Sequence, residues 1–524
     1  MNIMKNIKSI IAILLLAFVM SCDVEYYDTP NAPSEPPTAA VLNNSFKAMV
    51  DDFYDQWFGG RFTQVTMQYW TQSEYGDEDR YVYRETMRQT WEDFYFNAEN
   101  LRKVIQLNTD EETKNAAAAY GPNEYQIAVA RILLSWTFDM MANTWGDIPY
   151  YSYGNEDPSF QALELANTDE EILQPAYADQ AVIYADILNE LKEAAEQIGT
   201  DPQESIEGDN LYGGDMSKWV KFANSLRLRI ALKVMAVDPA LANQHISEIS
   251  AGEVFENDNE SAVFVYETSD GNASPYYRAY NVDNRSDFAM AYSFVQLLKG
   301  ENVVDTLGAD LTTNPFAGIV DPRLDIFAQQ NSDGVYIGMP VVENSSEAAT
   351  INWESLPGDA IINTPDFGQP IITYAEVMFI MSELNGWDQT YYEAGIRGSM
   401  ERWGIAASEI DDYIAAVPAA SMETVLTQKY IALYMDPHTA WTEYRRTGYP
   451  QTLVSPNSAF TINVPVRGIT KNFIFEPLIP TDDLPKRMRY PQYEQTLNGD
   501  NWAEAVADYE DGDAITSKLW WDVN

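Results

Sequence analysis

The sequence predicts a mainly α-helical protein in which paired helices are followed by a long, irregular, loop-rich region with short strands. Two observations support this fold class. Apolar residues recur at spacings of three and four in several segments, which is the pattern of one helix face. Between residues 252 and 363 that pattern is lost, and Gly, Asn, Asp, Ser and Pro dominate. An aromatic content of 13% indicates a folded chain despite the high charge.

The first residues have the features of a lipoprotein signal peptide. Lys5 and Lys8 precede an uncharged apolar run, Ile10–Met20, which is shorter than the about 20 residues of a membrane-spanning helix and has the length of a signal-peptide core. The run ends in Val19-Met20-Ser21-Cys22, which resembles a bacterial lipobox. We therefore expect residues 1–21 to be a signal peptide and Cys22 to carry the lipid. The alternative is an ordinary signal peptide with a chance cysteine.

Cys22 is the only cysteine of the 524 residues, so no disulfide within the chain is expected. Residues 22–39 are polar and contain four prolines, which is typical of a tether between lipid and domain. The acidic residues after the cysteine resemble an export signal of surface lipoproteins: Asp23, Glu25 and Asp28. Residues 40–524 are then expected to form the ligand-binding domain.

The charge balance limits the possible partners. The chain has 80 acidic and 32 basic residues, for a net charge of −48. A field of this sign repels phosphate backbones and acidic membrane surfaces, so we expect no nucleic-acid partner.

Seven segments are predicted helices. They are Glu124–Thr144, Ala178–Ile198, Trp219–Val234, Tyr374–Leu384, Tyr391–Trp403, Glu423–Met435 and Thr439–Arg446. Asn385-Gly386 is a helix stop and Asp388 a helix N-cap, which predicts a helix pair with the helix length of tetratricopeptide repeats. In the irregular region, short apolar runs such as Ala262–Val265 indicate small strands.

Several motifs, in order along the chain, together resemble the SusD/RagB superfamily, and more closely its SusD-like nutrient-binding branch. They are Thr144–Tyr150, Trp219–Arg229, Val320–Arg323, Tyr374–Val377, Tyr392–Ile396, Gln428–Leu433 with Trp441–Gly448, and Arg487–Pro491. The resemblance implies four TPR-like helix pairs with an irregular part packed against them. It also implies an outer-membrane lipoprotein, facing the cell exterior, that covers a SusC-type TonB-dependent transporter. Such proteins are not enzymes; they pass on an oligosaccharide or, in some branches, a peptide.

Arginines in these motifs are expected to be structural. Arg227 and Arg229 flank an apolar stripe and should pair with carboxylates of neighbouring helices. Arg323 is interpreted as a loop clamp, and Arg445-Arg446 as cations at a helix C-terminus.

Aromatic residues outside the helical stripes are the candidate ligand contacts. Sugar rings stack on flat aromatic side chains, while polar side chains bind the hydroxyls, and a peptide would use similar aromatic walls. The candidates are Tyr69, Trp70, Tyr75, Tyr81, Tyr276, Tyr277 and Tyr280, with Arg84 and Arg285 as polar partners. The alternative for each is an aromatic that packs a loop over the core.

Two other classes of protein were considered. The sequence has two histidines, His245 and His438, and it lacks the G-x-S-x-G, P-loop and H-E-x-x-H motifs. We therefore expect no cofactor, no metal and no catalysis, although a glycoside hydrolase based on two carboxylates stays open. The acidic turns at 256–260 and 305–310 do not complete a calcium loop. A structural or adhesive lipoprotein is the second alternative.

Overall fold

The computed structural model describes residues 35–84, 87–163, 172–249, 252–342 and 344–524. One compact unit comprises Thr38–Asn524, and residues 1–37 form a separate unit. The expected signal peptide and Cys22 lie outside the described residues. Helix α2 begins at Thr38, inside the last two residues that the sequence analysis gave to the tether. No helix in the described part of the chain is long and apolar enough to cross a membrane.

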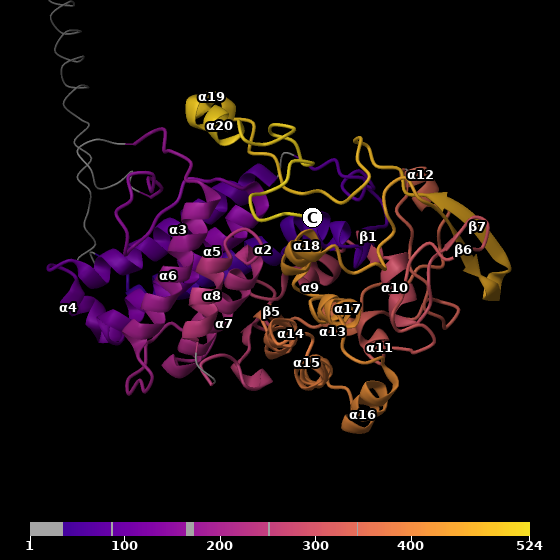
Figure 1. Cartoon of the computed structure of the whole chain (residues 1–524), viewed down its shortest axis with the longest axis horizontal. Coiled ribbons are helices and arrows are strands. Elements are labelled where there is room, and N and C mark those ends of the chain that lie inside the picture. Colours follow the sequence, from indigo (N-terminus) through magenta and orange to yellow (C-terminus); the bar gives the residue numbers. More distant parts are fainter. Residues whose placement is uncertain (1–34, 85–86, 164–171, 250–251, 343) are drawn as a thin grey trace, which may run out of the picture. The chain divides into compact units, whose positions relative to one another are not determined.

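The N-terminal part of this unit is a series of helices that pack as successive neighbours (Figure 1). They are α2 (Thr38–Tyr54), α3 (Met87–Thr109), α5 (Asn123–Trp145), α6 (Gln180–Ile198), α7 (Met216–Val234) and α8 (Pro239–Glu248). The helices predicted in α5, α6 and α7 are confirmed, whereas α2 and α3 were not predicted. In α2 the buried residues Leu42, Phe46, Met49 and Phe53 form one face at helical spacing.

A second group of helices lies near the C-terminus. It contains α14 (Tyr374–Leu384), α15 (Gln389–Arg402), α16 (Ala407–Ala416), α17 (Met422–Ala432) and α18 (Pro437–Thr447). The predicted pair is confirmed: Gly386 has φ +72° after α14, and the Asp388 carboxylate accepts from Thr390 N–H and Tyr391 N–H. Helix α17 ends before the predicted Met435, because Asp436 caps α18 and Pro437 opens it. The four helix pairs are α2–α3, α5–α6, α7–α8 and α14–α15.

Buried arginines join these helices, as the sequence analysis expected. Arg229 of α7 donates from Nε and Nη2 to Glu376 of α14 at 2.7 and 2.5 Å. Arg227 pairs with Glu248 of α8. Arg323 donates to Asp321 and also to Ser399 of α15 and Gln428 of α17. Arg229 and Arg323 are buried with their partners, whereas Glu248, the partner of Arg227, is exposed. The two buried pairs therefore specify most strongly how their segments meet.

The irregular region contains short strands in three small antiparallel sheets. β1 (Trp70–Gln72) pairs with β3 (Phe288–Met290), β2 (Ala262–Val265) with β5 (Gly368–Ile372), and β6 (Ala459–Val464) with β4 (Val304–Asp305) and β7 (Ile469–Ile474). The strand expected at Ala262–Val265 is confirmed. The remaining elements are η1 (Gln56–Gln64), α4 (Lys114–Ala117), η2 (Ala118–Tyr120), η3 (Asp258–Glu260), α9 (Pro275–Tyr277), η4 (Arg278–Val282), α10 (Tyr292–Leu298), α11 (Leu324–Phe327), α12 (Ser345–Ala348), α13 (Asp359–Ile362), η5 (Pro465–Arg467), α19 (Glu494–Leu497) and α20 (Gly499–Ala505).

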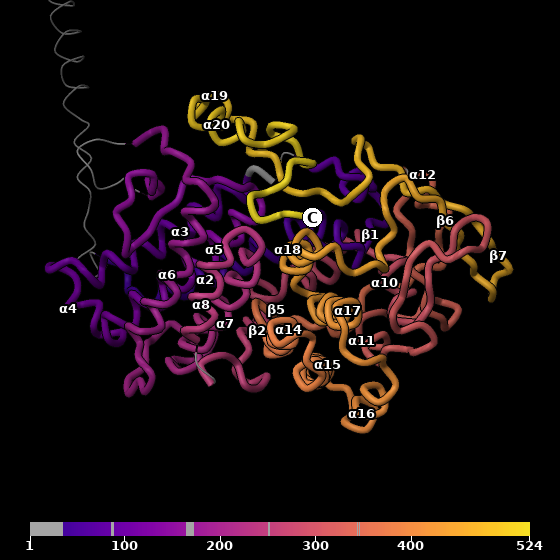
Figure 2. The backbone as a smooth tube through the Cα atoms, in the orientation of Figure 1, coloured from indigo at the N-terminus to yellow at the C-terminus, as the bar shows by residue number. Residues whose placement is uncertain are grey.

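The C-terminal segment, yellow in Figure 2, returns to the first helices. Met488 N–H donates to the carbonyl of Thr144 at 2.7 Å, and Arg487 donates to the carbonyl of Trp145 at 2.8 and 3.0 Å. The C-terminal segment therefore packs against the end of α5.

Candidate functional site

The β1–β3 ladder joins the two stretches that contain the predicted ligand residues. Gln72 lies opposite Phe288 at the end of this ladder. Beyond it, Ser73 N–H donates to Asp287 O at 2.8 Å, and Ser73 Oγ donates to Ser286 O at 2.9 Å. The loops that bear Tyr75 and Arg285 consequently leave the ladder at the same end.

The π-helix η1 adds Trp57 and Arg61, which were not predicted from the sequence. Its N-cap is Asp55, whose carboxylate accepts from Trp57 N–H and Phe58 N–H at 2.7 Å. The guanidinium of Arg61, one turn on, lies 4.8 Å from the ring centre of Trp57 and 5.9 Å from that of Tyr75. Short π-helical segments are frequent at functional sites.

Five residues form a surface group that we call the arginine–aromatic cluster. They are Trp57, Arg61, Tyr75, Arg84 and Arg285. Tyr75 is 44% exposed, and the Arg84 guanidinium lies 5.3 Å from its ring centre. The cluster thus presents an exposed ring beside the exposed Arg84, while Arg61 contacts this ring from a buried position.

Carboxylates orient the arginines of the cluster. Arg84 Nε lies 2.5 Å from Oε1 of the buried Glu78. Arg285 pairs with Asp287 at 2.8 Å, and the buried Arg61 pairs with the same carboxylate. Burial lowers the pKa of Arg61, and the charges of Asp287 and Glu78 oppose this shift. Guanidinium groups held in this way have fixed planes, which suits hydrogen bonding to hydroxyl or carboxylate groups of a ligand.

Four of the predicted ligand aromatics are buried. The ring of Tyr69 is stacked on that of Tyr430 with centroids 4.5 Å apart, and Tyr69 Oη donates to Tyr430 O at 2.5 Å. Trp70 Nε1 donates to the hydroxyl of Tyr434 at 2.7 Å. Because these rings are 0% and 1% exposed, no face remains for a ligand.

Tyr276 and Tyr81 are likewise core residues. Tyr276 packs against Trp70, with centroids 4.8 Å apart, and its hydroxyl donates to Asp55 O at 3.2 Å. Tyr81 packs against Phe475, with centroids 5.6 Å apart. These two residues, like Tyr69 and Trp70, have the positions of packing aromatics, the alternative considered from the sequence. We do not include the four in the surface group of arginines and aromatics described above.

The other two predicted aromatics are half-buried. Tyr280 Oη donates to the carbonyl of Phe288 in β3 at 2.7 Å, which ties η4 to the ladder. Tyr277 precedes it on α9 and is also half-buried. Both remain candidate contacts at the margin of the cluster.

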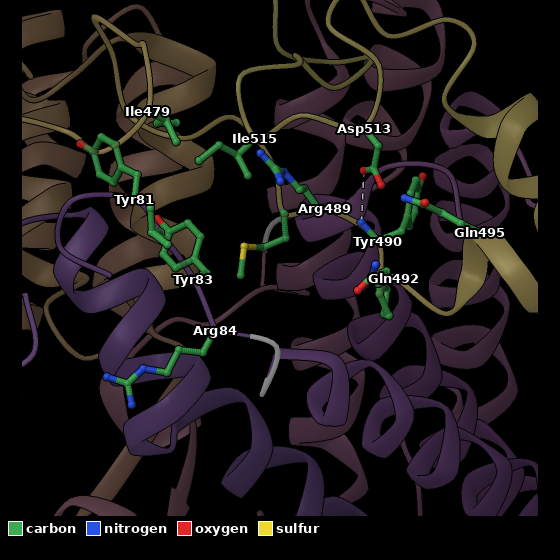
Figure 3. Close-up of a pocket in the computed structure, with 13 residues that line it drawn as sticks. Tyr81, Tyr83, Arg84, Ile479, Arg489, Tyr490, Gln492, Gln495, Asp513 and Ile515 are labelled. Carbon is green, nitrogen blue, oxygen red and sulfur yellow. Dashed lines mark hydrogen bonds between the residues drawn. The ribbon is translucent and has the colours of Figure 1, made fainter. Parts of the chain in front are cut away.

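A cleft of about 480 Å³ lies beside the cluster. Residues 81–84, Ile479, residues 488–492, Gln495, Asp513 and Ile515 line it (Figure 3). We call it the Arg489 cleft. Arg84 belongs to both features: its side chain lines the cleft, and its guanidinium contacts Tyr75. Arg489 lies in the family motif Arg487–Pro491, but it was not among the ligand contacts predicted from the sequence.

Within the described residues, no group of three or more His, Cys, Asp or Glu side chains is arranged to hold a metal ion. A scaffold of paired helices that supports loops and short strands places this protein in the class of helical-repeat proteins. Residues 30–468 match the family model SusD-like_2, described as starch-binding and associating with the outer membrane. Residues 415–522 match the model of SusD and RagB outer-membrane lipoproteins. The chain therefore belongs to the SusD/RagB superfamily, whose members are outer-membrane lipoproteins.

Solved structures share the fold over nearly the whole chain. A SusD homologue from Parabacteroides distasonis has a TM-score of 0.73 and 23% identity, covering 93% of this chain and 98% of that one. A chitin-binding protein has a TM-score of 0.70 and 22% identity over 93% and 100%. A chitin-binding SusD homologue from Flavobacterium johnsoniae has a TM-score of 0.69 and 20% identity over 92% and 99%. No curated protein sequence matches this one.

Proposed function

We propose that this protein binds an oligosaccharide at the arginine–aromatic cluster and passes it to a SusC-type TonB-dependent transporter of the outer membrane. The observation that supports this most directly is the exposed ring of Tyr75 beside the exposed guanidinium of Arg84. A sugar ring can stack its apolar face on the exposed part of this tyrosine while the oriented guanidinium groups of Arg84 and Arg285 bind its hydroxyls.

The experiment is a binding titration with a panel of oligosaccharides and a matched pair of variants. Tyr75→Ala should lower affinity about tenfold or more, since aromatic anchors are frequent hot spots. Tyr153→Ala is the control, because Tyr153 is 39% exposed and its ring centre lies 5.0 Å from the Arg131 guanidinium. Equal affinity of both variants and the wild type would contradict the proposed site. The panel should include chitin oligomers, because two similar structures are chitin-binding proteins.

Two alternative functions have distinct outcomes in the same assay. A peptide-binding member of the superfamily would bind peptides, which are added to the panel for this purpose, and no glycan. A glycoside hydrolase would release shortened products, which chromatography detects. In this structure Glu78 and Asp287 are each paired with arginine, an arrangement that suits orientation of the ligand more than proton transfer.

Anchoring is part of the proposal. We expect a lipid on Cys22 to hold the domain at the cell surface, where it remains at high local concentration beside its transporter. Cys22→Ala should release the protein from the membrane and abolish nutrient uptake without changing its unfolding transition. Uptake at the wild-type rate would contradict the anchoring role. Purification in mild detergent should recover a large β-barrel partner, and its absence would count against the transporter.

A further inference from the structure

We infer that the Arg489 cleft binds the carboxylate of an acidic sugar, so that the captured oligosaccharide contains uronic acid residues. This inference rests on the proposed function, which it extends from oligosaccharides in general to one chemical class.

The charge of the cleft lining is the first observation. Its ionic side chains are Arg84, Arg489 and Asp513. The Asp513 carboxylate is paired within the protein. It accepts from Arg487 Nη1 at 2.8 Å and from Tyr490 N–H at 3.2 Å (Figure 3). Arg84 is paired with Glu78. Arg489 is exposed, and its guanidinium has no hydrogen bond, ion pair or ring contact with any described residue.

This excess of positive charge differs from other clefts of the same unit. A cleft of about 740 Å³ beside α10 is lined by Lys299, Glu301 and Asp310. One of about 490 Å³ beside α2 has Lys47 and Glu267, and an apolar one of about 470 Å³ beside α3 has Glu99 and Glu494. These three linings are neutral or negative, as expected from 80 acidic and 32 basic residues.

Most arginines of the described residues are paired, so an unpaired guanidinium in a cleft is unusual in this protein. Of the arginines whose side chains the structure describes, only Arg278 and Arg489 lack a hydrogen bond, an ion pair or a ring contact. Arg278 is exposed on η4 and lines none of the clefts described above. Arg489 alone combines a free guanidinium with a cleft large enough for a sugar unit.

The chemistry of the surroundings favours a carboxylated sugar. A free guanidinium binds a carboxylate through two parallel, charge-assisted hydrogen bonds. Gln492 and Gln495, both exposed on the same side of the cleft, offer amides for neighbouring hydroxyls (Figure 3). The negative charge of the rest of the surface is screened beyond about 8 Å at physiological salt, so the local arginine dominates close to the cleft.

The test compares acidic oligosaccharides with their own neutral forms. Galacturonate and mannuronate oligosaccharides, each before and after chemical reduction of the carboxyl groups, are titrated into the wild type at physiological salt. We expect the acidic form of at least one to bind about tenfold to a hundredfold more tightly than its reduced form. Arg489→Gln should remove this preference, so that the acidic and the reduced form bind with similar affinity. Arg397→Gln, on the exposed face of α15, is the control and should change neither.

Two results would overturn the inference. They are equal affinity of the wild type for acidic and reduced forms, and an equal effect of Arg489→Gln on the binding of both forms. In each of these cases Tyr75→Ala would still weaken glycan binding, and the proposed function would stand. If neither acidic nor neutral glycans bound the wild type, the proposed function itself would fail.

Discussion

Arg61 and Asp287 form a buried ion pair between residues 226 positions apart in the sequence. Asp287 also pairs with Arg285 at 2.8 Å, so a single carboxylate orients two cations of the arginine–aromatic cluster. The β1–β3 ladder ends beside this pair, because Ser73 N–H donates to the backbone carbonyl of Asp287. The same residue thus links the cluster to the sheet that supports it.

Asp287→Asn should weaken both the fold and ligand binding. It leaves the buried Arg61 without a charged partner, which we expect to lower the free energy of unfolding by about 3 kcal/mol. Ligand affinity should fall about tenfold, because both guanidinium groups lose their orientation. Urea unfolding and calorimetric titration measure the two effects. Asp333→Asn, which removes the partly exposed partner of Arg467, is the control, with an expected change within about 1 kcal/mol.

Gly60→Ala tests the contact between η1 and β3. A Cβ atom at position 60 would lie 2.7 Å from Cζ of Phe288, so the π-helix or the buried ring of Phe288 must move. We expect a loss of about 1–3 kcal/mol in stability, as for other overpacked sites, and weaker ligand binding because Trp57 and Arg61 shift with the helix. At Gly271 a Cβ would meet nothing within 4 Å. Gly271→Ala should therefore be nearly neutral, and similar stability of both variants would contradict this packing.

The pair of Arg229 and Glu376 should contribute strongly to the joining of α7 and α14. Glu376→Gln leaves the buried guanidinium with Asp436 as its one remaining paired carboxylate, 3.6 Å away, and should cost about 3 kcal/mol in denaturant unfolding. Asp411→Asn breaks the exposed pair with Arg397 and should have little effect. A cost for Glu376→Gln no larger than for Asp411→Asn would show that the buried pair is dispensable.

Asp52 of α2 should make stability depend on pH. Burial raises the pKa of Asp52 to about 8, and the carboxylates of Asp93, Asp55 and Asp51 raise it further. The folded state therefore keeps a proton that the unfolded chain loses near its ordinary pKa of 3.8. Stability consequently decreases as the pH rises from about 4 to about 8.

Asp52→Asn should remove this pH dependence. The variant can still accept the hydrogen bond from Asn97, which is 2.9 Å long. We expect it to be more stable than the wild type by on the order of 1–2 kcal/mol near pH 9, and by much less near pH 4. Thermal unfolding over this range measures the difference. Asp110→Asn, at an exposed position, should show no such trend, and parallel pH profiles of the wild type and Asp52→Asn would refute the explanation.

The local helical signals predicted much of the fold. Helix α14 has the predicted bounds, Tyr374–Leu384, and Asp388 caps the next helix as expected, because caps and apolar stripes are local properties of the chain. Helix α2 was missed because its first two residues were assigned to the proline-rich tether.

The candidate site was predicted only in part, because its residues come from segments that are far apart in the sequence. Tyr75, Arg84 and Arg285 lie in the cluster, as loop composition suggested. Whether an aromatic in such a loop faces solvent or the core is decided by residues far along the chain. Tyr69 is covered by Tyr430, 361 positions away. Similarly, Arg489 comes near Arg84 only because the C-terminal segment returns to α5.

The sequence by itself therefore determined the helices and their caps, the expected lipobox at Cys22, the acidic surface and the resemblance to a family. Each of these depends on composition or on residues within a few positions of one another. Only the tertiary structure decided which aromatics are buried, which arginines share Asp287, and which arginine of the described residues lies unpaired in a cleft. These are outcomes of packing between segments that are distant in the sequence. A ring that packs in the core, or a charge that is paired there, is no longer accessible to a ligand.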